Sequence, residues 1–392
     1  MRTNRVNPVY AAMATTIFEE MSGLARETGA INLGQGFPDS IGPEELLRAA
    51  AEAVLAGPNQ YPPSAGMPVL RAAVADYYRR FQSLDIAASD VLVTSGATEA
   101  IAASLLAVIS PGDEVILIEP MYDAYRPLVE RAGGVARAVT LRPPEWRLPI
   151  DELAAAIGPR TRAIVLNNPN NPTGRVFARD ELAALAALCV AHDLVVISDE
   201  VWEAVVFDDA AHVPMIALPG MADRAVKIGS AGKIFGLTGW KVGFVVAGPR
   251  LLQPISRAHQ FLTFTTPPNL QIAVAHGLGL NDAFFSDARA ALERSRDHLA
   301  TRLAAAGFTV LPSQGTYFLT VNLAASGVNG DDTTLARRML HEAGVASIPL
   351  SSFYMNPAPA GLIRLCFAKP DEMLDEAATR LGKWLADQRP SD

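Results

Sequence analysis

The chain has only two cysteines, Cys189 and Cys366, among its 392 residues. Both lie in apolar surroundings, so we expect buried thiols rather than a disulfide framework or a metal site. No stretch approaches the roughly 18 uninterrupted apolar residues that a membrane helix needs. Residues 1–20 contain no apolar core of signal-peptide length. We therefore expect a cytoplasmic protein with no membrane partner and no metal centre.

An excess of basic charge is also lacking. The 33 basic and 41 acidic residues give a formal net charge of -8. This leaves no basic stripe for nucleic acid and no polybasic anchor for a membrane surface. Half of the residues are apolar, and a chain of this length can bury a large core, as one large domain plus a smaller one. These features indicate a globular enzyme rather than a nucleic-acid-binding protein.

Seven short apolar runs alternate with amphipathic helices from about residue 89. Strands of a parallel sheet that is covered on both faces are continuous apolar runs. We therefore predict an α/β fold with one seven-stranded, mostly parallel sheet flanked by helices, such as Glu99–Ile109 and Arg179–His192. The predicted strands are Val91–Thr94, Val115–Glu119, Val135–Leu141, Ala163–Asn167, Leu194–Ser198, Val226–Gly229 and Val242–Ala247.

A second, smaller α+β domain is predicted from the rest of the chain. After about Asn281 comes a long helix rich in Ala, Arg and Leu, and then a strand candidate at Gly315–Asn322. The segment before Pro43 is rich in Gly, Pro and Asn and has no sheet pattern of its own, so it is expected to pack against this second domain. The predicted limits are 41–284 for the large domain, and 1–40 with 285–392 for the small one.

The residues that follow these runs are unusually polar. Ligands of an open parallel sheet bind beyond the carboxyl ends of its strands, so these positions are candidates for a site. A helix cap, a turn or a solvated loop acid would be the ordinary structural interpretation of each. The segments are 95–99 (Ser-Gly-Ala-Thr-Glu), 167–174 (Asn-Asn-Pro-Asn-Asn-Pro-Thr-Gly), 198–200 (Ser-Asp-Glu) and 230–233 (Ser-Ala-Gly-Lys).

A lysine after glycine, as in Gly232-Lys233, suggests two other motifs. A phosphate loop needs a glycine five residues before Gly232 and a serine or threonine after the lysine, but the chain has Lys227 and Ile234 there. Ser230 and Lys233 fit the Ser-x-x-Lys motif of penicillin-recognising acyl enzymes, but no Lys-Thr-Gly follows. A serine acyl enzyme is therefore a weaker alternative.

Taken together, these residues resemble the class I, fold type I pyridoxal-phosphate aminotransferases from about Asn32 to Ala368. The resemblance implies the type I fold of these enzymes, pyridoxal 5′-phosphate as the cofactor, and a homodimer. It is carried by 171–174 (Asn-Pro-Thr-Gly), Asp199-Glu200, and 230–233 with Lys241 further along. Segments that look like the kynurenine, glutamine K and methionine aminotransferase branch are 34–39 (Gly-Gln-Gly-Phe-Pro-Asp), 59–61 (Asn-Gln-Tyr) and 232–243.

The resemblance assigns catalysis to Lys233. Its amine would carry the cofactor as a Schiff base and, once displaced by substrate, move the proton from the substrate's Cα to the cofactor. Asp199 would keep the cofactor's ring nitrogen protonated, because a buried carboxylate raises the pyridine's pKa. Asn171 is expected to donate to the phenolic oxygen, and Tyr122 to stack on the ring face. As plain structural features these last two would be a turn residue and a core residue.

The cofactor's phosphate is expected at the start of the helix that follows the first strand, where backbone N–H groups and the helix dipole favour an anion. Tyr61 resembles the tyrosine that reaches this phosphate from the neighbouring subunit, which is why a homodimer is implied. The expected phosphate-binding residues are Gly96, Ala97, Thr98, Ser230 and Lys241.

Arg364 matches the family arginine that binds the substrate's α-carboxylate, which needs a planar two-pronged donor. A lone arginine in an apolar strand can also be a snorkelling edge residue. Gly36 and Asn171 are expected to complete the carboxylate pocket. We infer a bulky uncharged donor, because the candidates for the side-chain pocket are aromatic, although each could equally belong to the core: Phe18, Phe37, Tyr122 and Phe353.

The chain departs from the family pattern at Trp202. That position, three residues after Asp199, is usually a tyrosine that donates to the phenolic oxygen. An indole N–H can donate but cannot accept, and its reach differs. Trp202 is counted among the expected cofactor-binding residues, and whether its indole donates to the phenolic oxygen as the tyrosine does is left open.

The sequence predicts a ping-pong aminotransferase that acts on an amino acid of methionine, glutamine or aromatic type and on a 2-oxo acid. A carbon-sulfur β-lyase would use the same Lys233, Asp199 and Arg364, so it is the main alternative. A non-catalytic pyridoxal-phosphate-binding protein is less favoured. Such a protein would be expected to carry a DNA-binding module or to lack Arg364.

Overall fold

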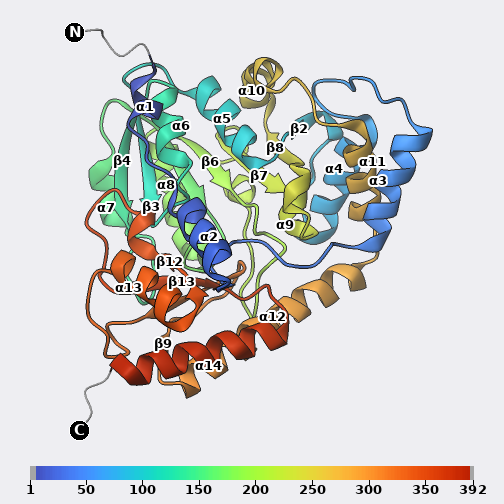
Figure 1. Cartoon of the computed structure of the whole chain (residues 1–392). Helices are drawn as coiled ribbons and strands as arrows, with labels where there is room; N and C mark the ends of the chain where they lie inside the picture. The colour runs from blue at the N-terminus through green and yellow to red at the C-terminus, as the bar shows by residue number, and fades with distance from the viewer. Residues whose placement is uncertain (1–5, 389–392) are drawn as a thin grey trace.

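The computed structural model describes residues 6–388, and its centre is a seven-stranded sheet (Figure 1). The strand order is β2-β8-β7-β6-β5-β3-β4; β8 runs antiparallel to both neighbours, and the other pairs are parallel. All seven predicted runs are strands of this sheet, so the predicted fold class is confirmed. The strands are β2 (Val91–Thr94), β3 (Glu114–Glu119), β4 (Val135–Thr140), β5 (Thr161–Asn167), β6 (Val195–Asp199), β7 (Ala225–Ser230) and β8 (Gly243–Ala247).

Helices cover both faces of this sheet. They are α3 (Glu44–Ala56), α4 (Pro68–Gln82), α5 (Ala97–Val108), α6 (Tyr125–Arg131), α7 (Ile150–Ala156), α8 (Arg179–Ala191), α9 (Ala231–Ile234), α10 (Pro249–Leu262) and α11 (Pro268–Leu278). In β3, Val115 and Leu117 pack into the core that includes α5 and α10, whereas Ile116 and Ile118 pack with α8. Side chains alternate across a strand, so continuous apolar runs supply both cores.

The predicted helix at Glu99–Ile109 begins two residues earlier, at Ala97. The reason is Gly96, which caps the helix with φ +82°, a left-handed conformation that L side chains rarely adopt. The helix predicted from Arg179 begins there, as expected. This earlier start of α5 brings the N–H groups of its first turn to the edge of the sheet beside β2.

A four-stranded sheet and the C-terminal helices form the lower part of the molecule in Figure 1, where α12 and α14 pack side by side. The predicted strand at Gly315–Asn322 is shorter in the structure, and starts at Phe318. The elements are α12 (Asp282–Ala305), β9 (Thr309–Val310), β10 (Phe318–Asn322), α13 (Asp332–Arg338), β12 (Ile348–Pro349), β13 (Leu362–Cys366) and α14 (Asp371–Gln388).

The N-terminal segment packs against these C-terminal elements, as expected. Its helices are α1 (Pro8–Ala11) and α2 (Ile17–Thr28), and α2 contacts β12. The segment does contain a short strand, β1 (Ile31–Asn32), which pairs in parallel with β11 (Val345–Ala346). The sequence shows no sheet pattern here because a two-residue strand is too short to produce one.

The predicted domain limits, 41–284 against 1–40 with 285–392, stay a prediction, and residues 1–5 and 389–392 lie outside the described part. Cys189 and Cys366 are buried free thiols, as expected. Within residues 6–388, no helix is long and apolar enough to cross a membrane.

Candidate active site

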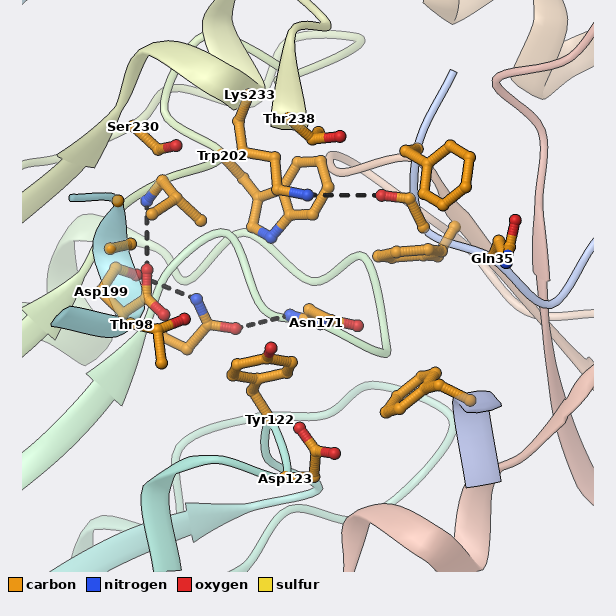
Figure 2. Close-up of a pocket in the computed structure, with 18 of the residues that line it drawn as sticks. Gln35, Thr98, Tyr122, Asp123, Asn171, Asp199, Trp202, Ser230, Lys233 and Thr238 are labelled. Atoms are coloured by element: carbon orange, nitrogen blue, oxygen red, sulfur yellow. Dashed lines mark hydrogen bonds between the residues drawn. The ribbon is translucent and has the colours of Figure 1, made fainter. Parts of the chain in front are cut away.

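A cavity of about 690 Å³ lies where β5, β6 and β7 end, between the large sheet and the small one. Figure 2 shows side chains from these strand ends, from α5 and from the N-terminal segment pointing into it. The predicted site residues that line it are Gly36, Gly96, Ala97, Thr98, Tyr122, Asn171, Asp199, Trp202, Ser230, Lys233, Lys241 and Arg364. The structure therefore brings together residues from Gly36 to Arg364, which are 364 − 36 = 328 positions apart. This is expected for a ligand site beyond the carboxyl ends of the strands of a parallel sheet.

Lys233 lies on the single turn of α9, directly after β7. Its Nζ is 3.3 Å from the carbonyl oxygen of Gly36 and 4.6 Å from the centre of the Trp202 ring. The hydroxyl of Tyr317 donates to the Lys233 carbonyl at 2.8 Å, which fixes the backbone of this turn. Burial lowers the pKa of the Lys233 amine to about 8. A neutral, nucleophilic amine is therefore accessible near physiological pH.

Asp199 ends β6 with its carboxylate buried. Oδ2 accepts a hydrogen bond from the hydroxyl of Tyr125 at 2.5 Å, and Oδ1 accepts one from Val201 N at 3.3 Å. Burial raises the pKa of Asp199 to about 6, although the bond from Tyr125 favours the ionised form. Sequence reasoning missed Tyr125, because its contact with Asp199 joins segments that are distant in the sequence.

The Asn-Pro segment after β5 joins the site to the sheet. Asn167 donates from Nδ2 to the Asp199 carbonyl at 2.9 Å, and its Oδ1 accepts from Asn171 N at 2.7 Å. Asn171 Oδ1 in turn accepts from Arg364 at 2.9 Å. Asn167 was not predicted as a site residue, but it ties the ends of β5 and β6 to the backbone that carries Asn171.

Arg364 is a buried cation in the middle of β13. Its guanidinium lies 3.8 Å from the centre of the Phe318 ring and donates to Asn171 and to the Gly34 carbonyl, while Nε has no partner. Within residues 6–388 no carboxylate forms an ion pair with it, and burial lowers its pKa to about 9. An unpaired buried guanidinium beside a cavity suits an anionic ligand.

The start of α5 forms a cradle for an anion. The N–H of Gly96 already donates to Thr94, so in the described chain Ala97 and Thr98 supply the free N–H groups. A Cβ on Gly96 would stand 3.3 Å from Lys241 Nζ, and one on Gly243 would stand 2.7 Å from the Gly96 carbonyl carbon. Two glycines thus allow the lysine and the helix start to approach each other. Ser230 ends β7 at the same cavity.

The one acid in the first turn of α5 has its own partners. The Glu99 carboxylate accepts from Ser95 N at 2.9 Å and lies 2.8 Å from His259 Nδ1. Burial would lower the pKa of His259, but Glu99 outweighs burial and raises it, which favours the charged ring. This acid is therefore neutralised locally, and the helix start keeps its preference for anions.

The aromatic candidates divide into two groups. Phe18, Phe37 and Tyr122 line the cavity, whereas Phe353 packs behind Phe18, with ring centres 5.6 Å apart. Trp202 packs edge-on against Tyr317 and Phe318. Its indole nitrogen points into the cavity in Figure 2, and within the described chain no acceptor takes its N–H.

Tyr61 does not line the cavity of this single chain. Its side chain is 84% exposed and packs edge-on against Phe264, with ring centres 5.5 Å apart. Gly36, in contrast, is at the cavity wall, and a Cβ there would stand 2.7 Å from the Phe318 ring. Besides Tyr125 and Asn167, sequence reasoning did not identify these polar residues that also line the cavity: Thr16, Glu19, Ser22, Arg26, Gln35, Asp123 and Thr238.

A partly buried lysine after a strand, a buried aspartate across from it and an anion cradle at a helix start fit pyridoxal 5′-phosphate, and the unpaired Arg364 provides for a second anion. The fold and these residues define a fold type I pyridoxal-phosphate enzyme. The chain belongs to the family described as aminotransferase class I and II, whose sequence pattern matches residues 28–381. The predicted family, enzyme class and cofactor are therefore confirmed.

Three relatives illustrate the similarity. The probable N-succinyldiaminopimelate aminotransferase DapC of Mycobacterium tuberculosis is 44% identical, over 97% of this chain and 98% of the relative. Kynurenine–oxoglutarate transaminase 1 of Rattus norvegicus is 36% identical, over 94% of this chain and 95% of the relative. The crystal structure of the methionine aminotransferase YbdL of Escherichia coli superimposes with a TM-score of 0.94 at 40% identity, over 97% of this chain and all of that one.

Proposed function

We propose that this aminotransferase exchanges amino groups between a bulky, uncharged amino acid and a 2-oxo acid by a ping-pong mechanism. The observation that supports this most is Arg364, a buried guanidinium at the cavity without a carboxylate partner in the described chain. Amino acids and 2-oxo acids share an α-carboxylate, which can pair with it from either substrate. The proposed carboxylate pocket is completed by Asn171, which accepts a hydrogen bond from Arg364, and by Gly36, which lies against the same Phe318 ring as the Arg364 guanidinium.

Lys233 is the proposed catalytic residue. Bound pyridoxal phosphate supplies an electron sink for the electron pair released at the substrate's Cα. Lys233 Nζ would hold the cofactor covalently and, once displaced by substrate, would move the proton from the substrate's Cα to the cofactor. Its lowered pKa of about 8 suits an amine that alternates between the two protonation states near neutral pH.

The remaining cofactor contacts are proposed from their positions in the cavity. Asp199 pairs with the ring nitrogen, and Tyr125 holds the Asp199 carboxylate. Tyr122 stacks on the ring, while Asn171 and Trp202 donate to the phenolic oxygen. The proposed phosphate contacts are the free N–H groups of Ala97 and Thr98, the Ser230 hydroxyl and Lys241. Gly96, whose own N–H donates to the Thr94 carbonyl, allows Lys241 to approach the helix start.

Three residues of the cavity lining, Phe18, Phe37 and Asp123, favour an uncharged side chain on the donor. The exposed Arg26, which also lines the cavity, would instead favour an acid. Phe18 and Phe37 supply apolar surface. Asp123 lies beside Tyr122 (Figure 2), and burial raises the pKa of its carboxyl. A second carboxylate on the substrate would meet this acid in a partly desolvated place, which is unfavourable. Methionine, glutamine and aromatic amino acids avoid that contact.

We further propose a cytoplasmic homodimer in which Tyr61 reaches the phosphate of the partner's site. The support is the exposure of Tyr61 together with other large apolar side chains of the same chain, such as Leu55 at 88% and Phe261 at 86%. Apolar surface of this kind is typical of an interface. Light scattering should give twice the mass of one chain, and Tyr61→Phe should weaken the cofactor's binding.

A half-reaction screen tests the proposal. The purified holoenzyme is mixed with one amino acid at a time, without 2-oxo acid, and the visible cofactor band is followed. Methionine, glutamine or phenylalanine should bleach it faster than glutamate or aspartate. A β-lyase would instead release pyruvate and ammonia from cystathionine continuously. Bleaching by acidic amino acids alone would contradict the proposed substrate class.

A further inference from the structure

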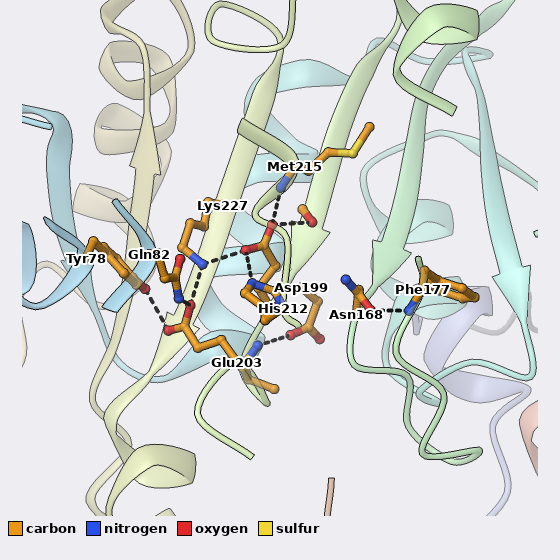
Figure 3. A network of polar contacts seen from close by, with 12 residues as sticks. Tyr78, Gln82, Asn168, Phe177, Asp199, Glu203, His212, Met215 and Lys227 are labelled. Atoms are coloured by element: carbon orange, nitrogen blue, oxygen red, sulfur yellow. Dashed lines mark hydrogen bonds and ion pairs between the residues drawn. The ribbon is translucent and has the colours of Figure 1, made fainter. Parts of the chain in front are cut away.

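A second set of buried charges lies behind the cavity, on the other side of β6 and β7 (Figure 3). Lys227 is in the middle of β7 and is fully buried. Its Nζ is 2.5 Å from Glu200 Oε2, forms an ion pair with Glu203 Oε2, and lies 4.6 Å from the centre of the Tyr78 ring. One ammonium therefore bridges two buried carboxylates.

Both carboxylates have further donors. Glu203 accepts from the Tyr78 hydroxyl at 2.9 Å and from Gln82 Nε2 at 2.6 Å. The donors to Glu200 are Ser198 Oγ at 2.8 Å, Met215 N at 3.0 Å and His212 Nε2 at 2.9 Å. Every oxygen of the two carboxylates thus has at least one partner. Lys227 offsets one of the two negative charges. Without it both carboxylates would be uncompensated buried charges, which are strongly destabilising.

The two glutamates belong to the turn that carries cavity residues. The turn follows β6 in the order Asp199, Glu200, Val201, Trp202, Glu203. Asp199, Val201 and Trp202 line the cavity, whereas Glu200 and Glu203 contact Lys227. The turn is therefore held from behind at two points, and the residues between and beside those points face the cofactor site.

We propose that Lys227 is a positioning residue for the cofactor: by bridging Glu200 and Glu203 it fixes the turn that presents Asp199 and Trp202 to the cavity. This inference rests on the proposed roles of those two residues. Lys227 itself does not line the cavity, so any effect on the cofactor passes through the turn.

The side chains around the ammonium are of the kind that could hold a divalent cation. Glu200, Glu203 and His212 each offer one ligand atom, and these three atoms lie within 4.8 Å of one another. Lys227 bridges the two glutamates of that set. Carboxylate and imidazole are ligands for zinc. Lys227→Ala should therefore create a zinc site in which the ion restores both the positive charge and the bridge.

The first experiment compares holoenzymes of wild type, Lys227→Met and Lys227→Met/Glu203→Gln. The double variant keeps the net charge of wild type but lacks the bridge. Both variants should lose at least tenfold in affinity for pyridoxal phosphate, and the pH midpoint of the visible cofactor band should shift in both. Arg296→Met is the matched control, because Arg296 is largely buried and paired with Asp208 outside the cavity. It should lower the melting temperature without changing the affinity or the midpoint.

Wild-type affinity and midpoint in the double variant would overturn the proposal, because charge rather than the bridge would then explain any effect of Lys227→Met.

The second experiment adds Zn²⁺ to Lys227→Ala, which should regain cofactor affinity, whereas Lys227→Ala/His212→Ala should not. No gain with Zn²⁺ would contradict the bridge. If Lys227→Met fails to fold, the double variant still decides. If wild-type protein carries no lysine-bound cofactor, the proposed function itself is refuted. Failure of the proposed function can therefore be told apart from failure of the proposal for Lys227.

Discussion

Two lysine-carboxylate sets lie on opposite faces of β6 and β7 and differ in how their charges are compensated. Behind the sheet, burial opposes the charges, but Glu200 and Glu203 outweigh it and raise the pKa of Lys227. Burial is likewise outweighed for Glu200, where Lys227 and His212 hold the pKa at about 2. In the cavity, burial prevails: it lowers the pKa of Lys233 to about 8 and raises that of Asp199 to about 6.

The difference separates structural charges from functional ones. Asp199 and Glu200 are adjacent in the sequence, yet their pKa values shift in opposite directions because one faces the cavity and the other faces Lys227. Charges behind the sheet satisfy one another. Charges in the cavity are left without full compensation, as is common where a ligand supplies the missing partner.

Lys233→Ala should produce the largest effect on the cavity side. The variant should lose the borohydride-reducible link to the cofactor and nearly all transamination, because no amine remains to form the link or to carry the proton. Reduction followed by peptide mapping measures the link. If the variant gives the wild-type yield of reduced adduct, the assignment is wrong and Lys241 becomes the next candidate.

Arg364→Lys tests whether the guanidinium in the cavity binds the substrate's α-carboxylate. An ammonium cannot reproduce the two-pronged geometry, so amino acids and 2-oxo acids should both bind more weakly, by about 2–5 kcal/mol if the pair is buried. Cofactor affinity should stay at the wild-type value, since Arg364 is assigned to the substrate. KM values for both substrates measure the effect. Unchanged values would place the carboxylate site elsewhere.

Tyr125→Phe tests the pH dependence of Asp199 in the apoprotein. The folded pKa of about 6 is above the unfolded value of 3.8, so the protonated carboxyl adds stability below about pH 4, and this stability is lost as the pH rises to about 6. Tyr125→Phe removes the hydrogen bond that lowers the pKa of Asp199. The pH at which this stability is lost should therefore rise from about 6 by about one pH unit. Unfolding free energies across pH measure it, with Tyr125→Phe/Asp199→Asn as the control that lacks this pH dependence. A loss of stability that stays near pH 6 would mean that Tyr125 does not stabilise the carboxylate.

Trp202→Phe should have the smallest effect. If the indole N–H donates to the cofactor's phenolic oxygen, its loss should move the pH midpoint of the visible band upward by a fraction of a unit, about what one hydrogen bond contributes. Asn171→Ala should move the midpoint in the same direction. A Trp202→Phe titration that superimposes on wild type, while Asn171→Ala shifts, would make Trp202 a packing residue only.

The sheet and much of the cavity could be predicted from the sequence because both depend on local patterns. Continuous apolar runs predict buried strands, and polar residues after them lie at the same edge of the sheet. Arg364 was assigned from the resemblance to the family, and its position as a lone charge within an apolar strand supported a functional role. Lys227 carries the same signal within Val226–Gly229, but the run was interpreted only as a strand. Its partners, Glu200 and Glu203, come from another strand end, and a single sequence does not show that pairing.

Other parts of the site depend on contacts between distant segments. Tyr125 meets Asp199 only because α6 and β6 converge, and α2 brings Phe18 and Arg26 to the cavity from the N-terminal segment. Neither contact follows from local spacing. The proposed contact of Tyr61 with a partner subunit lies beyond any single chain.

The most direct measurement is the unfolding free energy of the apoproteins of Arg364→Met and Lys227→Met. Lys227→Met should lose about 3–5 kcal/mol, because it leaves two buried carboxylates uncompensated. Arg364→Met should lose no more than about 1–2 kcal/mol, for the hydrogen bonds to Gly34 and Asn171, while it abolishes substrate binding. If Arg364→Met loses as much stability as Lys227→Met, the guanidinium stabilises the fold. That result would contradict the claim that Arg364 is left unpaired in order to bind the substrate's carboxylate.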